Sequence, residues 1–143
     1  MNRIAIVAVL LLATGCASVP MAPASVDSEA KQFKSIPDQA NIYVYRNEGI
    51  GAAIKMGIYA DEQPIAQTAA KTFINFQLAP GAHTIRGHAE NNSEVTLDAK
   101  GGELYFIWQE VKMGFASARN KLQIMDADEG KAGVQECKLV APK

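Results

Sequence analysis

The sequence has few of the residues that build catalytic or metal sites. Its 143 residues include two cysteines, Cys16 and Cys137, and two histidines, His83 and His88. The histidines are five residues apart in one predicted strand, so their side chains face opposite sides of it. The sequence has no His-x-x-x-His pair, no Gly-x-Ser-x-Gly elbow and no phosphate-binding glycine loop. We therefore expect a protein that is not an enzyme and that has no metal site and no cofactor.

The sequence also lacks an excess of charge and a membrane-spanning run. It carries 14 Lys and Arg against 15 Asp and Glu, for a formal net charge of −1. So weak a field predicts no nucleic-acid partner. The apolar run at residues 4–12 is shorter than the about 20 residues that a membrane-spanning helix requires.

The composition predicts one ordinary globular domain behind an N-terminal extension. Hydrophobic residues make up 48% of the chain and charged residues 20%, which is typical of globular proteins and argues against disorder. Residues 16–39 are rich in Ala, Ser and Pro and show no regular period. We expect them to form a flexible tether with at most a helical turn at residues 28–33. Residues 40–143 are then a single domain.

From residue 40 onward, short segments rich in β-forming residues alternate with turn residues. We expect strands at residues 41–46, 54–61, 65–68, 71–78, 83–90, 94–99, 103–112 and 120–126. The last segment, residues 127–140, is more helical in composition, although its two glycines weaken a helix. The pattern predicts an all-β fold, an antiparallel β-sandwich of seven or eight strands like the immunoglobulin fold, with a short irregular or helical C-terminal piece.

The N-terminus has the three parts of a signal peptide. Arg3 supplies a positive charge, residues 4–12 supply the apolar region, and the small residues 13–15 lead directly into Cys16. Small residues immediately before a cysteine resemble the lipobox of bacterial lipoproteins, although Ala13 stands where that family usually has Leu. An ordinary signal peptide with a chance cysteine, or an N-terminal core helix, is the alternative.

The lipobox resemblance implies a location and a modification. Residues 1–15 would be the signal peptide, cleaved between Gly15 and Cys16. The Cys16 thiol would receive a diacylglyceryl group, and the new amino group would receive a further acyl chain such as palmitate. Two or three acyl chains hold a protein firmly on a bilayer, whereas one holds it only reversibly. Residue 17 is Ala rather than the Asp that tends to retain such proteins at the inner membrane, so the resemblance implies the outer membrane, and we expect the protein to face the periplasm.

Two predicted strands run from apolar residues into charged ones. Alternate residues of a strand face the same side. In residues 103–112 the side expected to face the core ends in Glu110 and Lys112, and in residues 41–46 it ends in Arg46. The residues of the first strand expected to face the core are Leu104, Phe106 and Trp108. A buried charge needs a partner, so we expect Arg46 to meet Glu110 at one end of the sandwich.

This end of the sandwich is the candidate binding site. Tyr105 or Trp108 would offer a flat apolar surface beside the charges, with Lys112 or Arg119 nearby. The alternative is a purely structural ion pair at the rim. The candidate binding residues are Arg46, Tyr105, Trp108, Glu110, Lys112 and Arg119.

Other residues admit a plain structural interpretation. Tyr43, Tyr45 and Tyr59 would form an aromatic patch for sugar or peptide, or would simply cover one sheet face. Cys137 has no partner if Cys16 is acylated. We expect it to be a small buried residue beside Val134 and Leu139 rather than an exposed thiol.

The motifs "VYRNE", "QTAAKTF", "LAPGAHTI", "WQEVKMG" and "ECKLV" together resemble the bacterial lipoproteins grouped as domain-of-unknown-function family 2846, over residues 40–140. That resemblance implies a small β-rich domain behind a lipobox and no established activity. "LAPGAHTI" alone is also similar to the turn and strand of PEGA-type sandwich modules. We therefore expect a membrane-anchored envelope lipoprotein whose non-catalytic domain binds or supports an envelope protein or a glycan. The alternative is a carbohydrate- or peptidoglycan-binding module.

Overall fold

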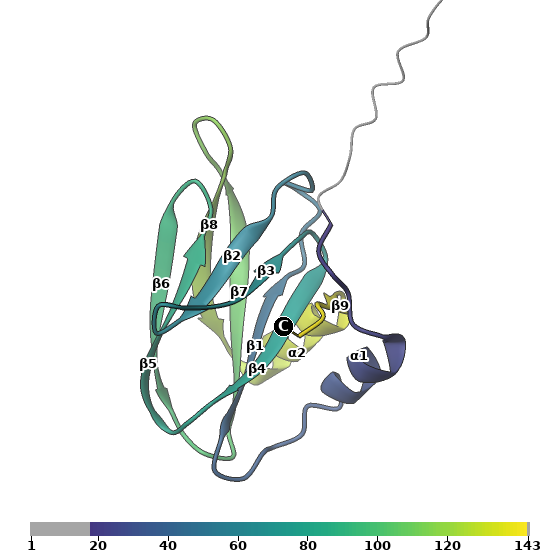
Figure 1. Cartoon of the computed structure of the whole chain (residues 1–143), viewed down its shortest axis with the longest axis vertical. Coiled ribbons are helices and arrows are strands. Elements are labelled where there is room, and N and C mark those ends of the chain that lie inside the picture. Colours follow the sequence, from purple (N-terminus) through teal and green to yellow (C-terminus); the bar gives the residue numbers. More distant parts are fainter. Residues whose placement is uncertain (1–17, 143) are drawn as a thin grey trace, which may run out of the picture.

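A computed structural model describes residues 18–142 and shows two β-sheets packed face to face (Figure 1). In the five-stranded sheet the order is β8 (Ala118–Met125), β7 (Leu104–Met113), β1 (Ala40–Arg46), β4 (Thr72–Leu78) and β9 (Lys138–Leu139). In the four-stranded sheet it is β3 (Gln63–Thr68), β2 (Met56–Ala60), β5 (Gly81–His88) and β6 (Asn92–Ala99). Helices α1 (Ala24–Ala30) and α2 (Ala127–Gln135) complete the fold.

The predicted β-sandwich is confirmed, with nine strands in the described chain rather than seven or eight. Every predicted strand is present, and its ends lie within two residues of the predicted ones. The additional strand is the two-residue β9, which pairs with β4. Most neighbouring strands are antiparallel, but β1 pairs in parallel with β7 and β4 with β9. The β2–β3 turn is at Asp61 and Glu62. Their φ values of 48° and 67° are both positive, as in the type I′ turn of two-residue hairpins.

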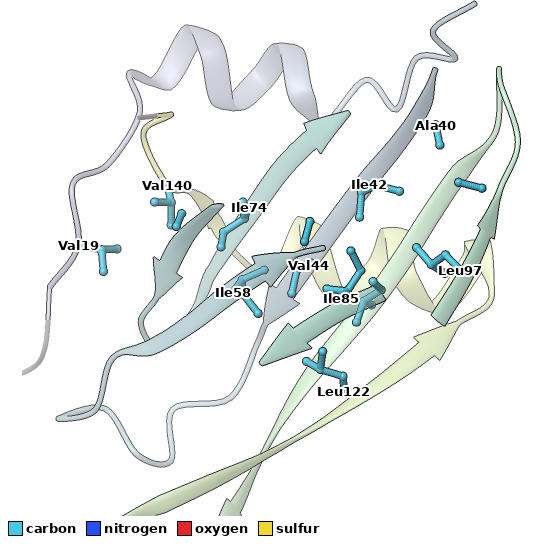
Figure 2. Packing of buried hydrophobic residues seen from close by; sticks show 14 of the residues in the cluster. Val19, Ala40, Ile42, Val44, Ile58, Ile74, Ile85, Leu97, Leu122 and Val140 are labelled. Carbon is cyan, nitrogen blue, oxygen red and sulfur yellow. The ribbon is translucent and has the colours of Figure 1, made fainter. Parts of the chain in front are cut away.

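The main core lies between the sheets (Figure 2). Ile42 and Val44 of the central strand β1 face Ile58 and Ile85 of the four-stranded sheet, and all four are fully buried. At one edge the sheets meet where the Leu122 backbone N–H of β8 donates to Ser93 Oγ of β6, at 2.9 Å. Alternation of apolar residues therefore positions both sheets around a common interior.

A second core covers the outer face of the five-stranded sheet. Tyr43 and Tyr45 of β1 point away from the first core. They pack with Phe73 of β4, Phe106 of β7 and, from α2, Val134. Every residue of β1 is buried because both faces of this strand are covered. The interpretation of Tyr43 and Tyr45 as cover for a sheet face is confirmed.

The two glycines of α2 permit this close packing. A Cβ placed at Gly130 would lie 2.3 Å from Phe106 Cβ, and one at Gly133 would lie 2.2 Å from Tyr45 Cε2. The Asp126 side chain accepts a hydrogen bond from the Glu129 backbone N–H and so begins the helix. The glycines that weaken the sequence signal for a helix are therefore required where this helix meets the sheet.

The core-facing phase predicted for β7 is wrong. Tyr105, Ile107 and Gln109 face the space between the sheets, whereas Phe106 and Trp108 belong to the outer cluster. Both phases of this strand carry large apolar residues because both faces of the sheet are buried. Alternation alone therefore does not distinguish the two faces of β7.

Residues 18–39, expected to be a flexible tether, instead pack against the sandwich. Val19 is only 8% exposed and joins the main core beside Val140 (Figure 2). Met21 forms a β-bridge with Val140, and the Asp27 side chain accepts a hydrogen bond from the Leu139 backbone N–H. A few anchoring side chains in a segment of Ala, Ser and Pro are enough to dock it, and they leave no periodic signal in the sequence.

Some predictions concern residues 1–17, which lie outside the described residues. These are the signal peptide and the acylation of Cys16, together with the inference drawn from Ala17. In residues 18–142, no helix is both long enough and apolar enough to cross a membrane.

Candidate functional site

The residues predicted to form a binding end do not form one site. Arg46 lies on the inner face of the five-stranded sheet, where its guanidinium reaches β3, whereas Glu110 lies on the outer face in phase with Trp108. The predicted Arg46–Glu110 pair is therefore wrong, because the two charges are separated by the sheet itself. Glu110 instead pairs with Lys112 at 2.8 Å and accepts a hydrogen bond from Gln123.

Arg46 is the largest fully buried side chain in the described chain. Its guanidinium donates to the carbonyl oxygens of Gly51 and Ile54, both at 2.7 Å, and more weakly to that of Thr68 at 3.5 Å. Burial lowers the pKa of Arg46, and the nearby Glu48 carboxylate partly opposes this shift. Its two closer partners, at Gly51 and Ile54, are backbone carbonyls of the β1–β2 loop, so Arg46 holds that loop in place from within.

A buried row of polar side chains continues from Arg46 through the interior. Thr68 Oγ1 donates to Gln109 Oε1 at 2.6 Å, and Gln109 Nε2 donates to Asn120 Oδ1 at 3.2 Å. Asn120 Nδ2 in turn donates to the Gly87 carbonyl across the sandwich. These groups are hydrogen-bonded to one another, which is what makes their burial tolerable. The row stabilises one end of the sandwich and offers no open ligand site.

The two candidate aromatic residues are separated in the same way. Tyr105 packs against the main core, and its hydroxyl accepts from the Lys100 backbone N–H at 2.9 Å, which orders the β6–β7 turn. Burial raises the pKa of Tyr105. Trp108 is half-buried in the outer cluster, and its buried Nε1 has no hydrogen-bond partner among the described residues. Neither ring stands beside Arg46 as an open platform.

The remaining charged candidates are surface pairs. Arg119 lies 3.7 Å from Glu90, and Lys112 pairs with Glu110 as described above. Both cationic side chains are half-exposed. Exposed pairs of this kind stabilise a protein weakly.

A pocket of about 310 Å³ opens between α1 and the outer face of β1 and β4. We call it the amide pocket because its floor is formed by Asn41, Asn75 and Gln77. Asn41 Oδ1 accepts from Asn75 Nδ2 at 2.7 Å and from Gln77 Nε2 at 3.1 Å, while Asn41 Nδ2 donates to the Lys34 carbonyl at 3.1 Å. Asn41 Nδ2 also donates to the Tyr43 hydroxyl at 3.3 Å, so both amide donors and the carbonyl of the buried Asn41 are used. Asn75 and Gln77 are more exposed, and no hydrogen bond to their side-chain carbonyl oxygens is present in the described residues.

The amide pocket also has apolar walls. Val26 of α1 and Leu139 of β9 line it, together with the Tyr43 ring, whose hydroxyl donates to the Ala30 carbonyl at 2.8 Å. Convergent amides beside apolar surface suit a ligand with hydroxyl or amide groups. No motif in the sequence predicts this site. Its only signal is three amides in strands, and strand register is needed to bring them together: Asn41 opposes Gln77, and Tyr43 opposes Asn75.

A wider hollow of about 510 Å³ lies on the outer face of β2 and β3. Tyr59 lies in it, but its ring is covered by the Arg86 guanidinium, 4.2 Å from the ring centroid, and lies close to the backbone at Gly57. A Cβ at Gly57 would be 3.0 Å from Tyr59 Cε2. The Arg86 guanidinium therefore covers one face of the Tyr59 ring, and Gly57 leaves room for the ring beside the backbone.

The histidines and Cys137 are placed as structural residues. His83 pairs with Asp61, which raises the pKa of His83 and lowers that of Asp61. His88 contacts Asn92 at 2.7 Å. No cluster of three metal-ligating side chains occurs within the part of the chain that the structure describes. Cys137 is buried beside Val134 and Leu139 as predicted, and burial raises the pKa of its thiol to about 12.

Comparison with known proteins adds a family and no activity. A family model described as a protein of unknown function, DUF2846, matches residues 37–121. An uncharacterized protein of Haemophilus influenzae Rd is 34% identical over 140 residues, which cover 96% of this chain and 83% of the relative. No solved structure matches the chain.

Proposed function

The chain belongs to the DUF2846 family of proteins of unknown function, and on that premise we propose that it is a lipid-anchored envelope lipoprotein with a non-catalytic β-sandwich domain. The observation that carries the proposal is the run of apolar and small residues that ends at Cys16. Acylation at this cysteine would place the protein in the cell envelope, at the outer membrane and facing the periplasm.

The burial of Cys137 and of Val19 supports this proposal. Cys137 is 1% exposed and packs in the outer cluster, so its thiol is not accessible for acylation in the folded protein. Val19, three residues after Cys16, is already part of the folded domain. Only three residue steps would then separate an acylated Cys16 from the folded domain.

Replacing each cysteine in turn tests the anchor. The variant Cys16→Ser should lose its acyl chains and move from the membrane fraction to the aqueous fraction of lysed cells. The matched variant Cys137→Ala, which removes the buried cysteine, should remain with the membranes. A Cys16→Ser protein that sediments with membranes to the same extent as the unaltered protein overturns the proposal. Mass spectrometry of the N-terminal peptide provides an independent measurement of the acyl chains.

The second candidate function is binding of a glycan or peptide of the cell wall in the amide pocket. It replaces the site expected around Arg46 and Glu110, which the sheet separates. The supporting observation is the pair of outward amides, Asn75 and Gln77, beside the apolar wall of α1. Such amides pair well with the hydroxyl and acetamido groups of wall glycans.

Co-sedimentation with purified peptidoglycan sacculi tests this second function. The detergent-solubilised protein should pellet with sacculi, and the double variant Asn75→Ala, Gln77→Ala should pellet less. The control Gln63→Ala removes an exposed amide from β3 in the other sheet and should leave binding unchanged. If the unaltered protein stays in the supernatant, the amide pocket does not bind the cell wall.

A further inference from the structure

One end of the sandwich displays large apolar side chains to solvent. Phe115 is 102% exposed and Met113 is 81% exposed, both at the β7–β8 hairpin, and Ile50 of the neighbouring β1–β2 loop is 52% exposed. Ile50 and Met113 line a common hollow of about 300 Å³ that Ile54 and Val111 continue inward. We call the exposed set Ile50, Met113 and Phe115 the apolar end. Clustered apolar side chains that are exposed to water usually mark a surface that binds another protein or a membrane.

The hairpin that carries Phe115 is held in a fixed shape. The Glu90 carboxylate accepts hydrogen bonds from three consecutive backbone N–H groups, those of Phe115, Ala116 and Ser117, at 3.0, 3.0 and 2.7 Å. These bonds lower the pKa of Glu90. At Gly114 a Cβ would lie 1.9 Å from the Ser117 carbonyl oxygen, so the turn also requires glycine. A carboxylate and a glycine therefore shape a turn whose effect is to present Phe115 outward.

The β7–β8 hairpin and the β1–β2 loop, which carry the apolar end, lie toward the same end of the molecule as the start of the described chain (Figure 1). Val19 and Pro20 share a small hollow with Lys55 of the β1–β2 loop. Lys55 and its neighbour Ile54 in turn line a hollow with Ala116 and Ser117 of the hairpin. Two neighbouring hollows, which share Lys55, thus lie between the N-terminal segment and the turn that carries Phe115.

Chain length then limits how far this end can stand from an anchor. Val19 is packed in the core, so only three residue steps separate it from Cys16. A fully extended chain covers roughly 3.3–3.6 Å per residue, which gives about 10 Å for this link. Acyl chains on Cys16 would therefore hold this end of the sandwich at the headgroup region of the bilayer.

We propose that the apolar end is a second membrane contact, in which Phe115, Met113 and Ile50 enter the interfacial region of the lipid leaflet that holds the Cys16 acyl chains. This inference rests on the lipid anchoring proposed above. Two of the nearby cations, Lys112 and Arg119, pair with Glu110 and Glu90, so the contact depends mainly on burial of apolar surface rather than on anionic lipid. The contact fixes the orientation of the domain, with β7 and β8 rising from the membrane.

A fluorescent label at position 115 tests this contact. The full chain, acylated by its host, is purified in detergent as the variant Phe115→Cys and labelled with the environment-sensitive dye NBD. Cys137 is buried and Cys16 would carry lipid, so the introduced thiol is the reactive one. The control Lys100→Cys places the same dye at the β6–β7 turn, at the opposite end of β7. Both proteins are reconstituted into vesicles of phosphatidylethanolamine and phosphatidylglycerol, with and without lipids that carry a quenching doxyl group.

The expected result is a blue shift of the dye at position 115 and its quenching by lipids with the doxyl group near the headgroup. The dye at position 100 should keep its emission in water and escape quenching. Exchanging Met113 and Ile50 for Ser in the labelled protein should reduce the quenching at position 115, whereas omitting phosphatidylglycerol should leave it unchanged.

The outcomes separate this inference from the anchor itself. If position 115 is as exposed to water as position 100 while Cys16→Ser still releases the protein from cell membranes, the membrane contact is overturned and the anchor stands. If a dye at position 115 in whole membranes is shielded from water but not quenched by lipid, a protein covers the apolar end and the inference is overturned. If Cys16→Ser leaves the protein in the membrane fraction, the anchor and the inference both fail.

Discussion

The sharpest quantitative prediction concerns Gly133, where helix α2 crosses the outer face of the five-stranded sheet. A methyl group added there would lie 2.2 Å from Tyr45 Cε2 and 2.7 Å from Tyr45 Cζ. Unstrained carbon atoms approach to about 3.5 Å, so the overlap exceeds roughly 1 Å. Tyr45 has little room to move, because it is 3% exposed on a strand paired on both sides. The exchange Gly133→Ala should therefore push the helix away from the sheet.

Two opposing effects determine the sign of the result. In an exposed helix, replacing Gly by Ala stabilises by about 1 kcal/mol. Overpacking a well-packed core typically costs about 1–3 kcal/mol. The severe overlap at Gly133 corresponds to the upper part of that range, so we expect a net loss of about 1–2 kcal/mol in the free energy of unfolding. For a protein of this size the midpoint of urea unfolding should fall by roughly 1 M.

Urea unfolding followed by tryptophan emission measures this loss. The only tryptophan of the chain, Trp108, packs at the edge of the outer cluster that contains Tyr45 and Val134, so its emission reports on this face. The matched control is Ala132→Gly, the reverse exchange at the neighbouring exposed helix position, which should cost about 1 kcal/mol through helix propensity alone. A higher urea midpoint for Gly133→Ala would refute the close packing of α2 on Tyr45.

Three further predictions follow from buried or paired groups. Arg46→Met should lower the free energy of unfolding by about 2–3 kcal/mol, measured by urea unfolding, because the Gly51 and Ile54 carbonyls lose charge-assisted donors; an unchanged midpoint would contradict this role. His83 has a raised pKa, so its pairing with Asp61 stabilises the fold fully below about pH 6.5 and less as the pH rises through the folded pKa. The urea midpoint of His83→Gln should lack that dependence between pH 5 and 8, and an identical pH profile for both proteins would rule it out. Cys137, with a pKa of about 12, should resist iodoacetamide at pH 8 until urea unfolds the chain, as mass spectrometry of the alkylated peptide would show; rapid alkylation of the folded protein would disprove its burial.

The sequence is most informative about strands, because turn residues and alternation are local signals. Ala79-Pro80-Gly81 predicts a turn, and β5 begins at Gly81, whose φ of 130° favours glycine. The same local reasoning predicts the burial of Cys137 beside Val134 and Leu139. These features depend on neighbours along the chain, which the sequence displays directly.

Features that depend on which face of a strand is covered were predicted poorly. In β7 both phases are apolar, and the sequence does not indicate that α2 covers one of them. The prediction that Phe106 and Trp108 face the core also puts Glu110 on the same side as Arg46. Because neighbouring residues of a strand face opposite sides, an error of one residue moves Glu110 to the opposite face of the sheet. The amide pocket was missed for a related reason: Asn41 and Gln77 meet only through the β1–β4 register.

The covering layer also bears on how the domain is delimited. Residues 37–121, which the family model matches, contain strands β1 to β7 and part of β8. They do not contain α1, α2 or β9, which cover Tyr43, Phe73 and Phe106 on the outer face. A domain cut at those limits would expose three large aromatic side chains that are each at most 1% exposed in the intact fold.

The two segments that close this face come from opposite ends of the described chain and hold each other in place. The Ala22 backbone N–H donates to the Leu139 carbonyl at 3.0 Å, and Lys31 Nζ donates to the Cys137 carbonyl at 2.6 Å. Residues 18–39 therefore belong to the folding unit and are not a spacer in front of it. An anchor at Cys16 would then be only three residues from a side chain of the core, which is why the side chains nearest that junction, and not those at the far end, are the ones expected to meet the lipid.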